Sequence, residues 1–96
     1  MGRVQYSRMG YIVFRSRSGW IAYNTNKRFE EGHTHLQSYH SAKNAINFCI
    51  ECRVPIKASE FYLVSLQRLT KHKPYYDALQ KRIEEIRSKG RYCDKE

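Results

Sequence analysis

Residues 11–24 have the sequence YIVFRSRSGWIAYN, and this stretch decides the expected fold. Two runs of aromatic and β-branched residues, 11–15 and 20–24, flank the polar segment SRSG. Such runs on either side of a short turn are typical of a β-hairpin, with Gly19 supplying the conformational freedom of the turn. The stretch therefore predicts two antiparallel strands that begin a small sheet.

After a polar loop that closes on Gly32, the hydrophobic pattern changes to the period of a helix. Ser38 or Ser41 is a suitable N-cap, and Pro55 a suitable stop. Apolar residues recur at i, i+3, i+4, i+7 and i+8, which is one face of an amphipathic helix: Ala42, Ala45, Ile46, Cys49 and Ile50.

Residues 60–69, EFYLVSLQRL, fit two kinds of element. Their β-rich start favours a strand, whereas Leu63, Leu66 and Leu69 also fit a helix at a spacing of three. Short apolar runs are not settled by periodicity alone, and we predict a strand here, with a helix as the alternative.

The C-terminal part has a clearer helical pattern. Pro74 suits a first helical turn, and Gly90 suits the end of the helix. Two acid-before-base pairs at i, i+4, Asp77 with Lys81 and Glu85 with Lys89, would add a little stability on an exposed face. One apolar stripe runs along the helix: Tyr76, Leu79, Ile83 and Ile86.

The resulting order, β–β–α–β–α, predicts an α+β fold with helices on one face of a small antiparallel sheet. The chain of 96 residues has the size of one domain. We expect a flexible N-terminal tail at residues 1–9, a single domain at 10–90 and a mobile C-terminal tail at 91–96.

Charge is the most informative feature of the composition. Lys and Arg number 18 against 9 Asp and Glu, which gives a net charge of +9. Such an excess attracts anionic partners, and nucleic acid or an acidic protein surface is the partner we expect. No apolar run is long enough to span a membrane. Three cysteines, an odd number, suggest reduced thiols and a cytoplasmic protein.

The segment GHTHL, residues 32–36, places two histidines side by side in a chain that has four. In extended backbone His33 and His35 point to one side, so the pair has three interpretations: a metal site, a catalytic pair or a loop that leads into the next helix. We favour the loop, with a left-handed turn at Gly32, with Leu36 packed on the core and with an anion at the helix N-terminus.

Metal or cofactor binding is not expected. Zinc sites need three or four ligands at suitable spacing. The CxxC letters of Cys49 and Cys52 fall inside a predicted helix, where Cys49 belongs to the apolar stripe. We attach no chemistry to Cys93.

The expected nucleic-acid contacts are cationic groups at loop tips, because phosphate contacts dominate such binding. Tyr11, Trp20 and Tyr23 lie on neighbouring strands, where some can face outward and stack on bases. The predicted binding residues are Arg15, Arg17, Lys27, Arg28, His33, His35, Lys71 and Lys73.

These observations favour a small nucleic-acid-binding module, RNA ahead of DNA, without catalysis. One alternative is a phage or mobile-element protein that docks on a nucleic-acid-handling or host-defence complex as an inhibitor. Another is a metal-independent endoribonuclease in which His33 and His35 act as general acid and base, with RNA cleaved by its own 2′-hydroxyl.

Overall fold

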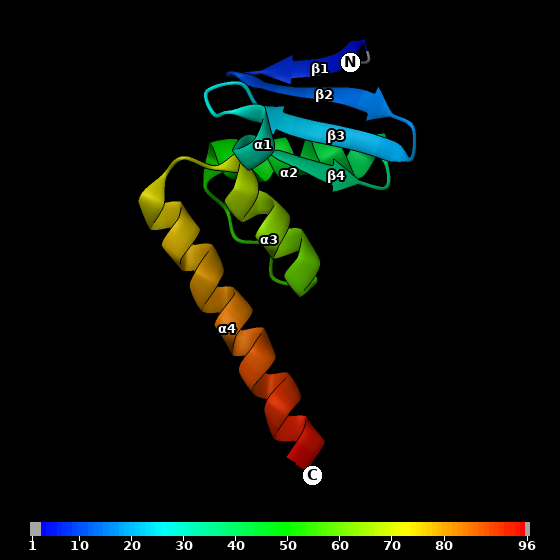
Figure 1. The fold of residues 1–96 in the computed structure, drawn as a ribbon. Coiled ribbons are helices and arrows are strands. Elements are labelled where there is room, and N and C mark those ends of the chain that lie inside the picture. Colours follow the sequence, from blue (N-terminus) through cyan, green and yellow to red (C-terminus); the bar gives the residue numbers. More distant parts are fainter. Residues whose placement is uncertain (1–2, 96) are drawn as a thin grey trace.

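The computed structural model describes the backbone of residues 3–95 and the side chains of residues 3–89. It confirms the α+β class: one antiparallel sheet, in the strand order β1-β2-β3-β4, is combined with helices (Figure 1). Along the chain the elements are β1 (Val4–Arg8), β2 (Tyr11–Ser16), β3 (Gly19–Asn24), α1 (Phe29–Gly32), β4 (His33–Leu36), α2 (Tyr39–Glu51), α3 (Glu60–Leu69) and α4 (Lys73–Lys95).

The predicted hairpin is β2 and β3, paired in register from Tyr11 opposite Asn24 to Ser16 opposite Gly19. Gly19 is therefore the first residue of β3 rather than a central turn residue. Its backbone has φ +157, and a Cβ atom there would lie 2.7 Å from the carbonyl oxygen of Leu36. The glycine is needed because β4 approaches it closely.

Residues 4–8 form a strand, β1, where a flexible tail was expected. Arg8 pairs with Tyr11, so Met9 and Gly10 make a two-residue turn. Their φ values of 50 and 86 are both positive, the geometry that matches the twist of paired strands. The hydrophobic pattern did not predict this strand, because an edge strand is largely exposed and can be polar. Met-Gly is also an unusual pair for such a turn, so the turn was not predicted either.

Residues 33–36 form a second unexpected strand, β4, instead of a loop into the helix. It pairs with β3, with Tyr23 opposite His33 and Trp20 opposite Leu36. Gly32 has no positive φ and lies in α1. A Cβ atom there would come within 2.6 Å of Cβ of Lys27, so close packing explains this glycine.

The helix predicted after Ser38 is confirmed as α2. The Ser38 hydroxyl accepts a hydrogen bond from the Ser41 amide, the usual N-cap contact. Ala42, Ala45, Ile46 and Cys49 of the predicted stripe are buried. The helix ends before Pro55, at Cys52 in the left-handed conformation with φ 54.

The strand prediction for residues 60–69 is wrong, because this segment is the helix α3. The Ser59 hydroxyl accepts a hydrogen bond from the Tyr62 amide and caps it. Leu63, Leu66 and Leu69 are completely buried, as the alternative prediction of a helix requires. Packing decided the outcome, since α3 is inserted between α2, α4 and the sheet edge at β4.

The last helix, α4, begins at Lys73, with Pro74 in its first turn as predicted. Leu79 and Ile83 are buried as expected, but Tyr75 rather than Tyr76 is the buried tyrosine. The helix also continues past Gly90 to Lys95 instead of ending there. A single glycine costs a helix only about 1 kcal/mol, which is too little to end it. The side chains of residues 90–95, and residues 1, 2 and 96, lie outside the described part.

The acid–base pairing along α4 also differs from the prediction. Asp77 pairs with Lys73 at 2.6 Å, and Glu85 pairs with Arg82 at 3.3 Å. Each acid therefore pairs with the cation one helical turn before it, at i, i+4 or i, i+3, instead of with the predicted lysine one turn after it.

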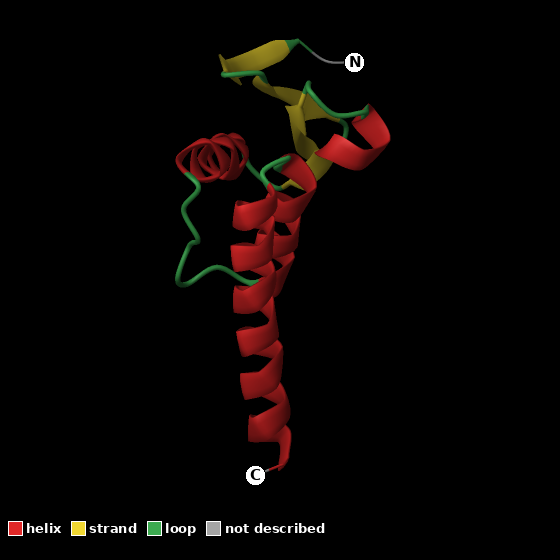
Figure 2. Cartoon of the chain, turned by 90° about the vertical axis from the view of Figure 1, so that its left-hand side faces the viewer, coloured by secondary structure: helices red, strands yellow, loops and turns green. Residues whose placement is uncertain are grey.

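The sheet has two different faces. Val13, Ala22 and Leu36 face the main core, which also contains the apolar sides of α2, α3 and α4. Phe14 and Ile21 point the other way and are buried beneath the short helix α1, whose Phe29 stacks on Phe14. Figure 2 shows α1 and α2 on opposite sides of the sheet. Within the described residues, no helix combines the length and apolarity that a membrane crossing requires.

Candidate nucleic-acid interface

The N-terminal strands carry positive charge without any acidic residue. The first acids in the chain are Glu30 and Glu31, after all three strands of the β1–β3 meander. Because no carboxylate lies on these strands or their turns, the net charge of the molecule is concentrated on this part of the sheet. The cations of this segment are Arg3, Arg8, Arg15, Arg17, Lys27 and Arg28.

One group of these cations lies where β1 meets α2. Tyr39, Lys43 and Asn47 are four residues apart, so they share one face of α2. The Asn47 side-chain oxygen accepts hydrogen bonds from Arg8 at 2.6 Å and from the Tyr6 hydroxyl at 3.2 Å. The Lys43 ammonium lies 5.2 Å from the centre of the Tyr6 ring, a cation–π distance.

The same surface continues toward the β2–β3 turn. The Arg15 guanidinium lies 5.7 Å from the centre of the Trp20 ring, and Trp20 meets Tyr39 edge to face at 5.2 Å. The nearest acid along this face of α2 is Glu51, which is paired with Arg53 at 3.0 Å. We call this surface the basic seam: Tyr6, Arg8, Arg15, Trp20, Tyr39, Lys43 and Asn47.

The two histidines are brought together on β4, but they are not equivalent. The His33 ring stacks flat on Phe29, with centroids 4.0 Å apart and planes 4° apart. Its Nδ1 forms a hydrogen bond with the Phe29 carbonyl and so carries the proton, because a carbonyl oxygen only accepts. His35 is exposed and meets His33 edge to face at 5.1 Å. His33 is thus fixed within the aromatic cluster, and His35 has the accessible ring.

His35 also lines two hollows between β4 and α3. One, of about 220 Å³, is bounded by His33, Thr34, His35, Phe61, Val64, Ser65 and Arg68. The other, of about 380 Å³, is bounded by Ser18, His35, Leu36, Gln37, Ser41, Ser59, Phe61 and Tyr62. Both pockets therefore share His35 and Phe61. We call the two together the β4–α3 groove.

Arg68 holds the end of this groove in place. Its Nε donates to the His33 carbonyl at 2.9 Å, and its Nη2 donates to the Glu30 carbonyl at 2.9 Å. Arg68, Phe61 and Val64 were not predicted as site residues, because their segment was expected to be a strand. The spacing of 61, 64 and 68 puts all three on one side of a helix, and that was the available signal.

Lys27 and Lys71 have structural contacts at the C-terminal end of α3. The Lys27 ammonium donates to the carbonyl of Arg68 at 2.7 Å, and that of Lys71 donates to the carbonyl of Asn26 at 3.2 Å. Cations at a helix C-terminus complement the helix dipole. Burial lowers the pKa of Lys27 from its ordinary value, with a further contribution from neighbouring Arg68. Both lysines hold the 25–28 loop against the helices.

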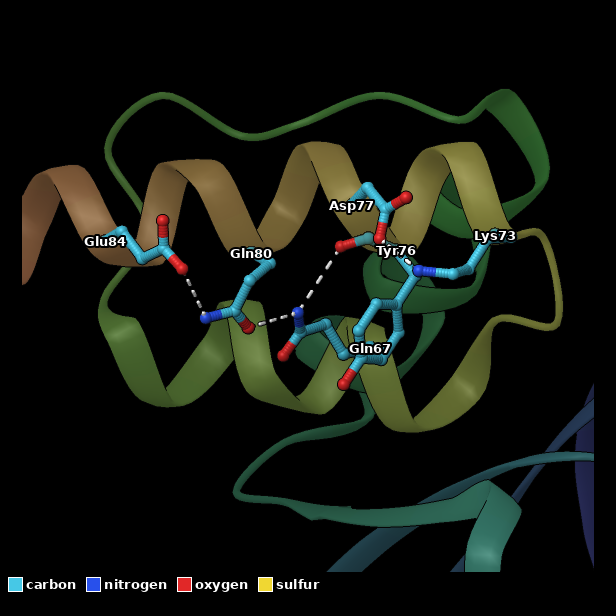
Figure 3. Close-up of polar contacts among 6 residues, drawn as sticks. All are labelled: Gln67, Lys73, Tyr76, Asp77, Gln80 and Glu84. Atoms are coloured by element: carbon cyan, nitrogen blue, oxygen red, sulfur yellow. Dashed lines mark hydrogen bonds and ion pairs between the residues drawn. The ribbon is translucent and has the colours of Figure 1, made fainter.

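Lys73 and Arg28 are exposed and each is paired with an acid. Figure 3 shows Lys73 beside Asp77 on the first turns of α4, where the two are 2.6 Å apart. The adjacent buried Gln67 donates to the Gln80 side chain at 3.0 Å. Arg28 lies 3.6 Å from Glu30. Among the predicted binding residues, Arg15, Arg17, His35 and Lys71 combine exposure with no acidic partner among the described side chains, although the Lys71 ammonium donates to the Asn26 carbonyl.

The three strand aromatics are packed against neighbours. Tyr11 and Trp20 contact the main core, and burial raises the pKa of Tyr11 to about 12. The Tyr23 hydroxyl donates to the Lys27 carbonyl at 2.5 Å, and its ring meets Phe29 edge to face. Trp20 is also part of the basic seam, whereas Phe61 is the most exposed of the Phe, Tyr and Trp side chains in the described part.

Cys49 lies in the core and its thiol is not activated. Burial raises its pKa from an ordinary 9.0 to about 12, so the reactive thiolate is scarce at neutral pH. Across the described residues, no group of three or more His, Cys, Asp and Glu side chains is arranged to hold a metal ion. Cys93 belongs to the residues whose side chains are not described.

Comparisons with protein-family models, with curated proteins and with solved structures yield no match for this chain.

Proposed function

We propose that this protein is a small nucleic-acid-binding module, with RNA as the preferred ligand, that contacts phosphates through the basic seam. The observation that carries the proposal is the acid-free arrangement of Arg8, Arg15 and Lys43 along one continuous surface, each beside an aromatic ring or an amide. Cations interleaved with aromatic and amide groups suit a phosphodiester chain, because the cations bind phosphates while the rings and amides contact sugars or bases.

The contacts of the seam keep its cations in place without neutralising them. Asn47 fixes Arg8 through a neutral oxygen, and the rings of Tyr6 and Trp20 hold Lys43 and Arg15 by cation–π attraction. The full charge of each group therefore remains available to an anion. By contrast, Arg28, Arg53 and Lys73 elsewhere on the surface have carboxylate partners.

The test is a binding titration of labelled single-stranded RNA, single-stranded DNA and duplexes at several salt concentrations. The seam variant carries Arg8→Gln, Arg15→Gln and Lys43→Gln. A matched control carries Lys57→Gln, Lys81→Gln and Lys89→Gln, which removes the same charge from exposed positions elsewhere.

We expect the seam variant to bind at least tenfold more weakly than the control. The slope of log affinity against log salt should fall by about 2 for a single strand, since each lost phosphate contact accounts for about 0.7. Equal weakening in the two variants would mean that net charge alone drives binding and would reject the seam. Wild-type protein that binds no nucleic acid at low salt would reject the function and favour an acidic protein partner.

The same samples decide the ribonuclease alternative. The RNA recovered from each titration is run on a denaturing gel beside RNA incubated with the variant His35→Ala. Cleavage that depends on His35 would show that the protein is an enzyme, whereas intact RNA is the outcome that the binding function requires.

A further inference from the structure

We infer that the β4–α3 groove binds two consecutive unpaired nucleotides of a single-stranded nucleic acid, with the rings of Phe61 and His35 between the two bases. This inference rests on the proposed nucleic-acid-binding function and specifies the form of the ligand. It involves residues that the basic seam does not contain.

Phe61 is the first reason. Its side chain is 69% exposed on α3, although its neighbour Leu63 is completely buried. A phenylalanine that contributes so little to the core is explained most simply by a ligand that covers it. Val64, one turn further along the helix, extends the same apolar surface into the groove.

The opposite wall is a rigid stack of rings. Phe14 stacks on Phe29, Phe29 stacks on His33, and His35 meets His33 edge to face. His33 is further fixed by its hydrogen bond to the Phe29 carbonyl. The accessible His35 ring thus has a fixed ring at its edge before a ligand arrives, and this contact lowers the entropic cost of stacking.

The two pockets have the arrangement that adjacent nucleotides need. The first has a volume of about 220 Å³ and the second about 380 Å³, and both are bounded by Phe61 and His35. A base in each pocket would have a face against this shared pair. Two hydroxyl groups line the smaller pocket, and they hydrogen-bond to each other: the Thr34 hydroxyl donates to the Ser65 hydroxyl at 2.8 Å.

Charge at the two ends favours a phosphate chain over an apolar peptide. Arg68 lines one end, and Arg17 is exposed in the β2–β3 turn next to Ser18, which lines the other end. Of the acids nearest in sequence to the lining, Glu60 binds Arg87 at 3.1 Å and Glu30 lies beside Arg28, whereas Glu31 has no ion pair among the described side chains. The positive charge at the groove ends comes from Arg68 and Arg17.

The larger pocket of the groove lies close to the basic seam. Trp20 of the seam pairs with Leu36, which lines the larger pocket, and Ser41 of that pocket follows Tyr39 by two residues in α2. A single-stranded nucleic acid that leaves the groove past the β2–β3 turn would therefore contact Trp20 and Arg15. A rigid duplex cannot splay its bases into two pockets, whereas a single strand can.

The experiment compares single-stranded RNA with the same sequence as a duplex, using a fluorescent base analogue placed at each position in turn. The groove variants are Phe61→Leu, which removes the ring and keeps the apolar bulk, and Phe61→Trp, which keeps an aromatic face. The control is Tyr76→Leu, which removes another exposed ring from α4.

We expect single strands to bind more tightly than duplexes and two adjacent positions of the base analogue to be quenched. Phe61→Leu should weaken binding about tenfold and abolish the quenching, whereas Phe61→Trp and Tyr76→Leu should bind like the wild type. If Phe61→Leu binds and quenches normally while the seam variant is impaired, the groove inference is wrong and the proposed function stands. If the wild-type protein binds no nucleic acid, both are wrong.

Discussion

His33 and His35 are the same residue type on the same side of β4, but their neighbours give the two rings different accessibility. Both rings lie on the same side of β4, as their i, i+2 spacing predicted. One of them is engaged by Phe29 and the other is free to contact a ligand. A shared acid–base role needs two accessible imidazoles, and the structure gives accessibility to His35.

Gly19 allows a test of how closely β4 packs against the start of β3. We expect Gly19→Ala to lower the free energy of unfolding by about 1–3 kcal/mol, because the residue has a positive φ and its new methyl would meet the Leu36 carbonyl oxygen at 2.7 Å. Urea denaturation followed by circular dichroism measures this change. Ser18→Ala, one residue earlier and exposed, is the control and should be nearly neutral. Equal stability of the two variants would show that β4 does not press against this position.

At the scale of elements, α3 is the one whose type the sequence left open. As a helix it buries Leu63, Leu66 and Leu69 completely and leaves Phe61 and Val64 on the outside. As a strand it would have placed residues 64 and 66 on one face. The β4–α3 groove therefore depends on residues 60–69 being a helix.

Alanine substitutions distinguish these two structures directly. Leu66→Ala should cost about 2–5 kcal/mol, as expected for a leucine with no solvent exposure. Val64→Ala, at a position 36% exposed, should cost about 1 kcal/mol or less. Thermal or urea unfolding of both variants measures the difference. Similar losses at the two positions would contradict the helix.

The whole molecule combines a neutral interior with an uneven surface charge. The cations of the sheet have no acids on the same strands, while Glu60, Asp77, Glu84 and Glu85 lie on α3 and α4. The molecule measures 49 × 29 × 21 Å, because α4 extends well beyond the sheet (Figure 1). Cations also lie beside these acids on α3 and α4, so the acid-free strands are the end of the protein that an anionic partner would preferentially approach.

The buried tyrosines and Cys49 predict that the folded protein loses stability at alkaline pH. Burial raises the pKa of Tyr11, Tyr62 and Cys49 to about 12, and raises that of Tyr75 as well. In the unfolded chain these groups ionise at their ordinary values of 9.0 to 10.0. Above pH 9 the unfolded state therefore binds fewer protons than the folded state, and the free energy of unfolding falls as pH rises toward 12.

Urea midpoints between pH 7 and pH 11 measure this loss. We expect a constant midpoint up to about pH 8.5 and a steady decline above it. Tyr62→Phe removes one of the ionising groups and should make the decline shallower. A midpoint that does not change up to pH 11 would show that these groups ionise alike in both states.

The amino-acid sequence was enough to predict the α+β class, the β2–β3 hairpin, α2 with Ser38 or Ser41 as its cap, most of the α4 stripe and the excess of positive charge. These features depend on local patterns: periodicity, capping residues and composition. Tertiary structure alone decided that residues 4–8 and 33–36 are strands, because each is short and gains its hydrogen bonds from a neighbouring strand. It also decided that residues 60–69 are helical, since three sides of that segment are covered by other elements. The basic seam and the β4–α3 groove belong to this second group: their residues are far apart in the chain, and only packing brings them together.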